Sequence, residues 1–244
     1  MIALTDKSVL ITGASSGIGA AVARTLADAG ANIALMARGE NGLKEVAGNL
    51  PDPERVLVIP GDVTSEPDVR QAIHQTVDRF GSLDILVNNA GFGLFKPVDE
   101  LTAEEFDGMI AVNLRGVFLA TKYALIQMYE QGKGGDIVTI SSLAGKNGFT
   151  GGGGYTASKF GVMGLMESVF HEARTRNVRV ITLTPGSVDT PFFDDTGMTP
   201  PNRANILQPE DVAVTVLHAL VLPERALIRE LDIRPANPKR QESN

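Results

Sequence analysis

The sequence alternates short apolar runs with longer segments of helical period, and this alternation constrains the fold more than any other feature. The apolar runs lie at 9–11, 33–35, 56–59, 85–87, 137–140 and 178–181. They are nearly continuous, as expected of strands that are covered on both faces. Helical segments lie near 17–29, 40–50, 66–80, 103–130, 155–176 and 209–222. This order predicts an α/β fold, in which a mostly parallel, doubly wound sheet carries helices on both faces.

The chain shows no sign of division into domains. No Pro- or Ser-rich linker and no internal repeat interrupts the 244 residues, so we expect one domain over residues 1–244. A last strand is expected at 227–228 or at 231–233. Residues 190–208 have no clear period, and a long irregular segment in a compact domain is often a lid over a site. We therefore expect a substrate lid at about 190–208.

Local signals mark where some of the helices start. The expected N-terminal residues are Ser65 or Thr64 before the segment at 66–80, Thr102 before 103–130, and Pro209 at the start of 209–222.

Composition and charge exclude several classes of protein. The absence of cysteine excludes a disulfide framework, a thiolate zinc site and a cysteine nucleophile. The net charge is −7 with no basic cluster, so a nucleic-acid partner is not expected. The three histidines, His74, His171 and His218, lack the spacing of metal ligands, so no metal site is expected.

The distribution of apolar residues gives no sign of a membrane segment. No apolar run approaches the roughly 20 residues that cross a bilayer. Residues 1–6 lack the basic and apolar stretches of a signal peptide. We expect a soluble, cytoplasmic protein.

A glycine-rich turn follows the first predicted strand and opens the first predicted helix. It reads Thr12-Gly13-Ala14-Ser15-Ser16-Gly17-Ile18-Gly19. Glycines let a backbone turn tightly and approach a pyrophosphate, which then faces the amide groups of the helix N-terminus. The spacing differs from the generic Gly-x-Gly-x2-Gly pattern, so an ordinary glycine-rich turn remains an alternative when the motif is taken alone.

Other predicted strand ends are also polar or rich in glycine. They are Gly61-Asp62-Val63, Asn88-Asn89-Ala90-Gly91, Ser141-Ser142 and Pro185-Gly186. In a doubly wound sheet, ligands bind beyond the carboxyl ends of the strands. Four such ends on one edge of one sheet favour a binding site over a set of plain turns.

Tyr155 and Lys159 form the next group together with Ser142. A tyrosine and a lysine four residues apart share one face of a helix, so the ammonium can lie near the phenol. A nearby cation favours phenolate, and we therefore expect a lowered tyrosine pKa. Such a tyrosine can donate a proton to an alkoxide or remove one from an alcohol. Tyr129 and Lys133 have the same spacing, but glycines end the helix there and Gly116 replaces the serine.

With these motifs in place, the sequence resembles the short-chain dehydrogenase/reductase family from about Lys7 to Leu222. The resemblance implies a Rossmann-type sheet of order 3-2-1-4-5-6-7 and reversible hydride transfer between a nicotinamide and a carbonyl/alcohol pair. It implies that Tyr155 is the general acid/base, that Ser142 polarises the carbonyl, and that Lys159 lowers the tyrosine pKa and holds the ribose. Asn113 matches the fourth residue of the family's catalytic set, which kinks its helix and holds a water. A surface amide is the alternative for Asn113.

The resemblance also implies a set of cofactor-binding residues. These are Gly13, Ser15, Ser16, Gly17, Ile18, Gly19, Arg38, Asp62, Val63, Asn89, Ala90, Gly91, Tyr155, Lys159, Pro185, Gly186, Val188 and Thr190.

Arg38 is the residue from which we predict the choice between the two nicotinamide cofactors. Dinucleotide folds place an acid about 20 residues after the glycine turn to bind the ribose 2′-OH, whereas an arginine there suits a 2′-phosphate. The second predicted strand ends at Arg38, with no acid before Glu40. We therefore expect NADP(H), with a solvated surface arginine as the alternative.

Two departures from the family bear on the substrate. Gly151 to Gly154 directly precede Tyr155, so we expect an open or mobile wall at this point. The ending at 230–238 lacks Asp-Gly-Gly and looks more like NADP-dependent carbonyl reductases and 3-hydroxy acid dehydrogenases. Pocket candidates by family position are Phe92, Leu94, Leu143, Phe149, Val188, Phe192 and Phe193. Since no arginine is among them, a small neutral ketone or aldehyde is favoured.

Two other functions remain as alternatives. A redox sensor could bind the dinucleotide without turnover, although the set of Asn113, Ser142, Tyr155 and Lys159 argues against this. An isomerase or dehydratase would need an additional acid or base.

Met163 and Met166 lie on the helix of Tyr155, which in relatives often packs against a partner subunit. We therefore expect a homodimer or homotetramer, and packing of these methionines within one subunit is the alternative.

Overall fold

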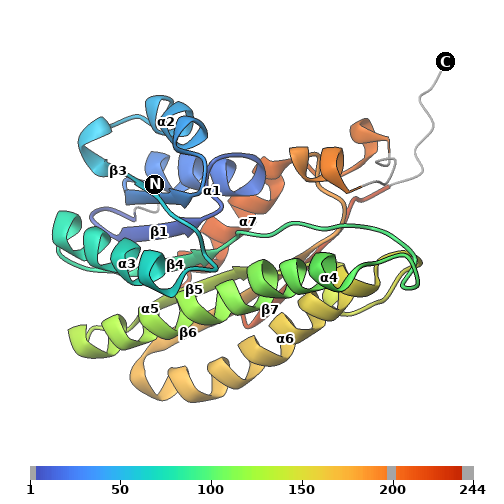
Figure 1. Cartoon of the computed structure of the whole chain (residues 1–244). Helices are drawn as coiled ribbons and strands as arrows, with labels where there is room; N and C mark the ends of the chain where they lie inside the picture. The colour runs from blue at the N-terminus through green and yellow to red at the C-terminus, as the bar shows by residue number, and fades with distance from the viewer. Residues whose placement is uncertain (1–3, 197–201, 238–244) are drawn as a thin grey trace.

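One parallel sheet of seven strands organises the computed structural model, which describes residues 4–196 and 202–237. The strands are β1 (Ser8–Thr12), β2 (Asn32–Ala37), β3 (Val56–Pro60), β4 (Ile85–Asn88), β5 (Gly135–Ile140), β6 (Val178–Pro185) and β7 (Glu230–Ile233). Their order is β3-β2-β1-β4-β5-β6-β7, as predicted, and every neighbouring pair is parallel (Figure 1). Of the two positions expected for the last strand, 231–233 is correct and 227–228 is wrong.

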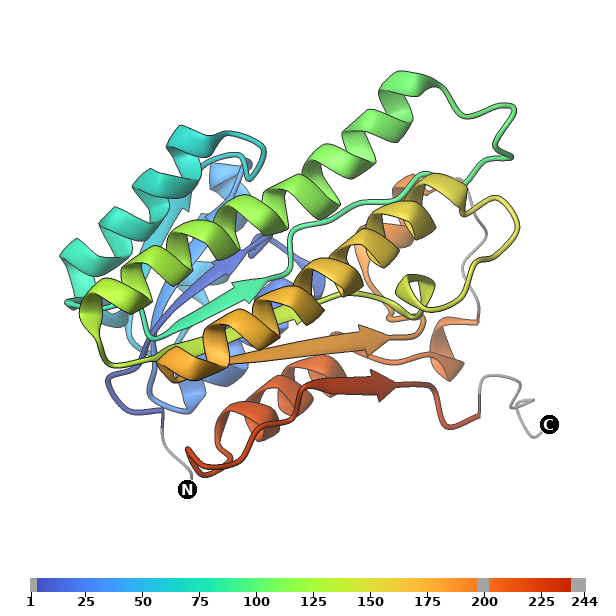
Figure 2. The ribbon, with the colours of Figure 1, turned by 90° about the horizontal axis from the view of Figure 1, so that it is seen from below.

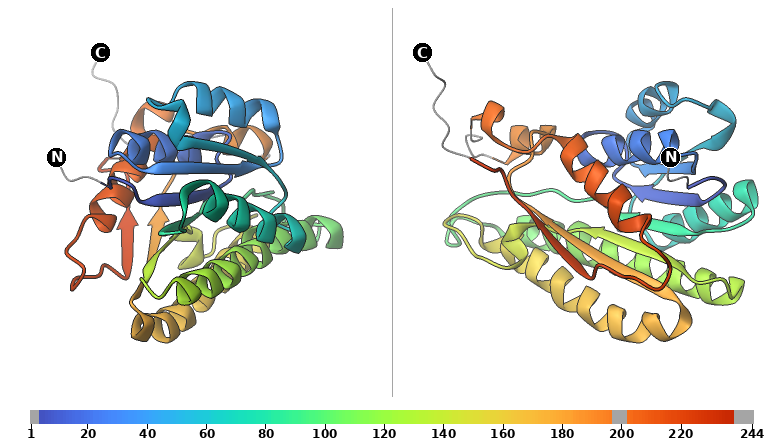
Figure 3. Two further views of the ribbon diagram at one scale, coloured as in Figure 1. Left: turned by 90° about the vertical axis from the view of Figure 1, so that its left-hand side faces the viewer. Right: turned by 180° about the vertical axis from the view of Figure 1, so that it is seen from behind.

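Helices cover both faces of the sheet (Figure 3). They are α1 (Gly17–Asp28), α2 (Glu40–Gly48), α3 (Glu66–Phe80), α4 (Ala103–Ile110), α5 (Val117–Gln131), α6 (Gly153–Ala173) and α7 (Pro209–Leu220). α1, α2 and α7 share one apolar core with the sheet, and α3, α5 and α6 share the other. The fold is therefore the doubly wound α/β architecture that the alternating pattern predicts.

The predicted helix starts are found where side chains cap the first turn. Ser65 accepts a hydrogen bond from the Asp68 amide at the start of α3. Thr102 and Glu105 form a reciprocal capping box at the start of α4. Pro209 is the first residue of α7.

The segment expected as one helix over 103–130 contains a π-helical stretch, Ala111–Gly116, between α4 and α5. A π-turn inserts one extra residue per turn and often occurs at functional sites. Here it carries Asn113, which is fully buried. The alternative of a surface amide for Asn113 is therefore wrong.

The same continuous helix, Ala103–Gln131, is long and apolar enough to span a membrane by length and composition, with a mean hydropathy of 1.4 over an 18-residue stretch. Buried core helices pass the same test. In this molecule α5 packs on α3, and α4 and the π-helical stretch pack on α6 (Figure 2).

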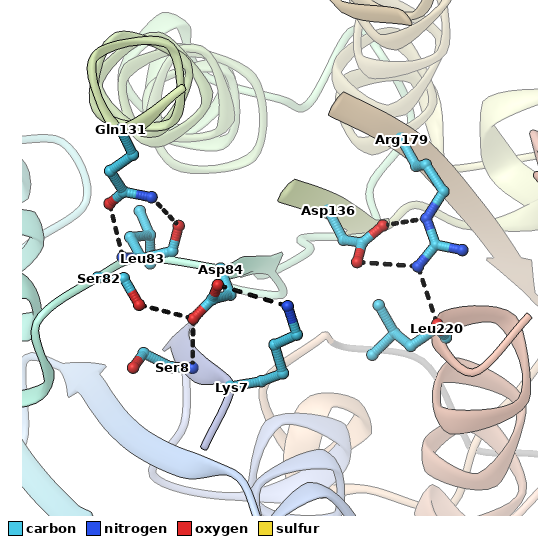
Figure 4. Close-up of polar contacts among 9 residues, drawn as sticks. All are labelled: Lys7, Ser8, Ser82, Leu83, Asp84, Gln131, Asp136, Arg179 and Leu220. Carbon is cyan, nitrogen blue, oxygen red and sulfur yellow. Dashed lines mark hydrogen bonds and ion pairs between the residues drawn. The ribbon is translucent and has the colours of Figure 1, made fainter. Parts of the chain in front are cut away.

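Polar side chains tie the elements together at the amino-terminal edge of the sheet (Figure 4). Asp84 accepts hydrogen bonds from the Ser8 amide at 2.9 Å and from the Ser82 hydroxyl at 2.8 Å. Gln131, the last residue of α5, accepts from the Leu83 amide and donates to its carbonyl. The start of β1, the segment before β4 and the end of α5 are thus held together on the side opposite the strand carboxyl ends.

A bidentate ion pair between Arg179 and Asp136 joins β6 to β5 at this edge (Figure 4). Their side chains are only 17% and 15% exposed. The Arg179 guanidinium also donates to the Leu220 carbonyl at 2.8 Å, at the end of α7. Burial raises the pKa of Asp136, and hydrogen bonding to Arg179 opposes that rise. One arginine therefore holds two strands and a helix end.

We predict that Arg179→Leu lowers the free energy of unfolding by about 3 kcal/mol, because it leaves the Asp136 carboxylate buried and unpaired. Urea unfolding followed by circular dichroism measures the change. Arg229→Gln is the matched control, since Arg229 is about half exposed where it pairs with Glu167 and Glu230, and such pairs contribute below about 1 kcal/mol each. A loss for Arg179→Leu as small as that of the control would contradict the prediction.

Candidate active site

The carboxyl ends of neighbouring strands open into one large cavity. The strands point toward a common edge (Figure 2), and a cavity of about 1300 Å³ lies there. This volume exceeds the upper range of about 1,000 Å³ for pockets that hold one drug-sized ligand. Of the residues expected at the site, the lining includes Gly13, Ser15, Ser16, Gly17, Ile18, Arg38, Asp62, Val63, Asn89, Ala90, Gly91, Ser142, Tyr155, Lys159, Pro185, Gly186, Val188 and Thr190. Gly19 and Asn113 lie behind this surface.

The glycine turn after β1 is packed so closely that side chains do not fit. Gly13 has φ +64°, and a Cβ there would lie 2.7 Å from the Ala90 Cα. A Cβ on Gly19 would lie 2.3 Å from the Gly13 carbonyl oxygen. The Asn89 side chain donates to the carbonyls of Thr12 and Gly13, at 3.1 and 2.9 Å. The turn is therefore fixed by the segment after β4, and Gly19 supports it from behind.

The N-terminus of α1 follows this turn and provides an anion-binding surface. Ser15 and Ser16 line the cavity just before the helix begins at Gly17. The first turn of α1 contains no acidic residue. Its unpaired amides and positive dipole end can therefore bind a phosphate without repulsion from a carboxylate in that turn.

Arg38 lies at the end of the cavity beside β2. It follows the last residue of that strand, is exposed, and lines the cavity with Asp62 and Val63 from the segment after β3. Within residues 4–196 and 202–237, Arg38 makes no ion pair with a carboxylate. Its guanidinium is thus available to a ligand.

Tyr155 and Lys159 lie on the first two turns of α6, and both are buried. The Lys159 Nζ lies 5.7 Å from the centroid of the tyrosine ring and donates to the Ile140 carbonyl at 3.2 Å. Ser142, which follows β5, lines the same cavity. Helical spacing and the end of β5 thus bring the three predicted side chains together.

Desolvation controls the electrostatics of this pair. Burial raises the pKa of Tyr155 to about 12, and hydrogen bonding to Ser142 opposes the rise. Burial lowers the pKa of Lys159 to about 8. The expectation that the ammonium lowers the tyrosine pKa is therefore wrong for this structure, because loss of water around the phenol outweighs the distant cation. At neutral pH the phenol is protonated and the lysine is mostly charged.

Asn113 acts beneath the cavity surface. Its side chain accepts from the Phe92 amide and donates to the Phe92 carbonyl and the Ser158 hydroxyl. Gly91 separates it from the cavity: a Cβ there would lie 3.2 Å from the Asn113 Oδ1 and 3.7 Å from the Lys159 Nζ. Asn113 thus fixes the segment after β4 against α6.

The region next to Tyr155 is lined by aromatic rings. Six of the seven apolar candidates line the cavity, namely Phe92, Leu143, Phe149, Val188, Phe192 and Phe193. Leu94 does not, and its place is taken by Phe95, which the sequence reasoning missed. The Phe95 ring packs edge-on against Phe149 and Tyr155, with centroids 5.2 and 5.5 Å apart. These contacts fix the walls around the phenol.

An arginine also lines this cavity. The argument for a neutral substrate considered seven apolar candidates with no arginine among them, and it did not include Arg234, which follows β7 directly and lines the cavity. Nothing in the local sequence at 234 indicates this, because its place depends on how β7 pairs with β6.

The glycines before Tyr155 were expected to form an open or mobile wall, but they are closely packed and none of the four lines the cavity. Gly152 and Gly154 are buried. A Cβ on Gly152 would lie 2.3 Å from the Phe149 ring, and one on Gly154 would lie 2.3 Å from the Met109 methyl. Phe149 from the same loop and Met109 from α4 fill the space that these two glycines leave.

The segment expected as a lid is anchored at its base. Val188 and Leu207 form a parallel β-bridge, and Arg203 contacts Asp189 at 2.6 Å and Asp194 at 2.8 Å. A 3-10 helix, Pro191–Asp195, carries Phe192 and Phe193 into the cavity wall. Residues 197–201 of the expected lid lie outside the described residues.

The comparisons with known proteins agree with this geometry. The family model for short chain dehydrogenases matches residues 7–200. An uncharacterized oxidoreductase of Staphylococcus saprophyticus is 35% identical over 237 residues, which is 96% of this chain and 100% of the relative. A solved alcohol dehydrogenase from the archaeon Thermococcus sibiricus, complexed with 5-hydroxy-NADP, has a TM-score of 0.86 and 34% identity, covering 97% of this chain and 99% of that one.

A second solved structure is similar over the same extent. The 3-ketoacyl-(acyl-carrier-protein) reductase from Brucella melitensis, complexed with NADH, has a TM-score of 0.88 and 30% identity, covering 96% of this chain and 99% of that one. The chain belongs to the short-chain dehydrogenase family and is an oxidoreductase.

Proposed function

We propose that this protein is an NADP(H)-dependent oxidoreductase that interconverts a ketone or aldehyde and the corresponding alcohol, with Tyr155 as general acid/base. One observation carries the proposal. Tyr155, Ser142 and Lys159 line the same cavity as the glycine turn after β1 and the N-terminus of α1. A proton donor and a phosphate-binding surface in one cavity are what hydride transfer from a dinucleotide requires.

The residues present fit a nicotinamide dinucleotide. The close packing of Gly13 and Gly19 leaves bare backbone where a pyrophosphate approaches, and Ser15 and Ser16 add hydroxyl donors. Asp62 and Val63 would lie against the adenine, and Val188 and Thr190 against the nicotinamide. The cofactor, when bound, supplies or accepts the hydride.

The chain's own residues handle the proton. With a pKa of about 12, the Tyr155 phenol is neutral at physiological pH and serves as proton donor to a carbonyl oxygen during reduction. Ser142 holds that oxygen by a second hydrogen bond. Lys159 presents an ammonium to the ribose hydroxyls. Asn113 holds the backbone at Gly91, which lies between the Asn113 side chain and the Lys159 ammonium.

Preference for the phosphorylated cofactor rests on Arg38. A 2′-phosphate carries close to two negative charges near neutral pH, and a guanidinium can bind it bidentately. Arg38 lines the cavity and has no carboxylate partner among the described residues. This charge balance favours NADP(H) over NAD(H).

The cellular setting and assembly are part of the same proposal. We place the protein in the cytoplasm as a homodimer or homotetramer, with no metal, nucleic acid or membrane partner. The exposed Phe118 and Ile126 on α5 and Phe160 on α6 support self-association. Met166 is buried inside the subunit and does not contribute to such a surface. The segment 190–208 would close over the bound ligands.

The first prediction tests the proton donor. Tyr155→Phe removes only the hydroxyl, so kcat for carbonyl reduction should fall by about 100-fold or more while the NADPH Kd stays within about threefold. Steady-state rates and NADPH fluorescence titrations measure the two. Tyr129→Phe is the matched control and should keep its activity, since Tyr129 has the same Lys spacing but does not line the cavity. Retention of a tenth of kcat by Tyr155→Phe would show that another group donates the proton.

The second prediction tests the cofactor preference. The wild type should favour NADPH over NADH by about tenfold or more in kcat/KM, since each hydrogen bond to a charged group contributes about 1.5–3 kcal/mol. Arg38→Asp should erase or reverse this preference. Arg24→Asp makes the same charge change on the far part of α1, where Arg24 faces Glu210, and should preserve the preference. Equal use of both cofactors by the wild type would rule out this role for Arg38.

The third prediction concerns pH and follows from the Lys159 pKa of about 8. Below that value the lysine is charged and attracts the cofactor, and above it the lysine becomes neutral. NADPH affinity should therefore fall as the pH rises above about 8, whereas the 2′-phosphate, with a pKa of about 6, is already ionised there. Fluorescence titration from pH ~7 to ~10 measures the curve. Lys159→Met should bind more weakly and without this inflection; the same inflection in both proteins would contradict the assignment.

A further inference from the structure

We propose that Arg234 makes the substrate cavity selective for carbonyl compounds that carry a carboxylate, so that the substrate class is an oxo acid and its matching hydroxy acid. The inference rests on the proposed function and names the substrate for the same site. It differs from the expectation of a neutral substrate, which was drawn from seven pocket candidates that include no arginine.

The backbone on both sides of Arg234 is fixed against the site. β7 ends at Ile233, whose carbonyl accepts from the Gly186 amide at 2.8 Å. On the other side, a Cβ on Gly186 would lie 3.2 Å from the Pro235 ring. Arg234 is therefore held beside the end of β6, where Pro185, Gly186 and Ser187 line the cavity.

The Arg234 guanidinium makes one ion pair among the described residues, and that pair is long and exposed. Its nearest carboxylate is Asp232, at 3.6 Å, which is beyond a good hydrogen bond. The other carboxylate oxygen of Asp232, Oδ1, accepts hydrogen bonds from Lys146 and from the Thr184 hydroxyl. The Arg234 side chain is 57% exposed while it lines the cavity. Its planar fork of donors can thus receive a ligand carboxylate.

The charges along the cavity favour an anion at this end. Among the described residues, Asp62 is the one acidic residue that lines the cavity, and it lies at the far end, beyond β3. Of the lining cations, Arg38 is at that same far end and Lys159 is buried and bonded to the Ile140 carbonyl. Asp232, 3.6 Å from the guanidinium, does not line the cavity, and its charge is shared with Lys146. A substrate carboxylate beside β7 would therefore meet Arg234 at the cavity wall.

The remaining wall fits an apolar body between the two polar groups. Ser142 follows β5 and Arg234 follows β7, with β6 between them. Neighbouring strands are about 4.8 Å apart, so these strand ends are separated by about 10 Å. The rings of Phe149 and Phe192 line the cavity near Tyr155. This spacing favours an acid whose carboxylate is several bonds away from the carbonyl.

Binding of an inert acid tests Arg234 without any turnover. The probes are 4-phenylbutanoate and its neutral match, 4-phenylbutanamide, titrated by calorimetry into protein saturated with NADP(H). The wild type should bind the acid about tenfold more tightly than the amide. Arg234→Gln should remove this difference, and Arg234→Lys should restore part of it. Arg229→Gln, a matched arginine that does not line this cavity, should keep the full difference.

Turnover gives the second measurement, with 4-oxo-4-phenylbutanoate and its methyl ester as substrates. The ratio of kcat/KM for acid over ester should fall about tenfold in Arg234→Gln, mostly through KM. If no carbonyl compound is reduced, the proposed function fails, and the calorimetry still decides the role of Arg234. The proposal would be overturned if the wild type did not bind the acid, or if it bound acid and amide equally well. It would also be overturned if Arg234→Gln lost NADPH affinity but kept its selectivity for the acid.

Discussion

The contact between the ends of β1 and β4 is the constraint on which the site depends. The strand order reverses there. The chain therefore leaves the ends of β1 and β4 in opposite directions, which exposes a crevice between them. The Asn89 side chain holds the carbonyls of Thr12 and Gly13, and the Thr12 hydroxyl accepts from the amides of Asn89 and Ala90. Because Gly13 lies against Ala90 without space for a Cβ, the backbone surface that faces a pyrophosphate is set by packing and not by the loop alone.

Burial gives this crevice its chemical character. The same packing that places Tyr155 and Lys159 under the ends of the strands removes water from both, which raises the pKa of the phenol and lowers that of the ammonium. The phenol is thereby kept as a proton donor, and the lysine is brought close to the physiological pH range. The aromatic walls at Phe95 and Phe149 maintain this desolvation, and the amino-terminal edge, with Arg179, secures the strands that carry it.

Local patterns were enough to predict the strands, the helices and the grouping of Tyr155 with Lys159, because apolar period and i, i+4 spacing are properties of contiguous residues. The order of the strands came from the family resemblance. Features that depend on distant packing were not predictable. Arg234 lines the cavity because β7 pairs with β6 in one register, and the space beside Gly154 is filled by Met109 from α4. The tyrosine pKa follows from burial by the whole fold. The exchange of Leu94 for Phe95 reflects an irregular loop, where no period fixes which side chain points inward.

A crystal structure of the protein with NADP+ would test the central claim, that the β1–β4 crevice and the Tyr155 cavity form one dinucleotide site. The account predicts the pyrophosphate at the N-terminus of α1, the 2′-phosphate on Arg38, and the nicotinamide between Tyr155 and Thr190. A cofactor bound in the reverse orientation, with the adenine at Thr190, or bound outside this cavity, would contradict it.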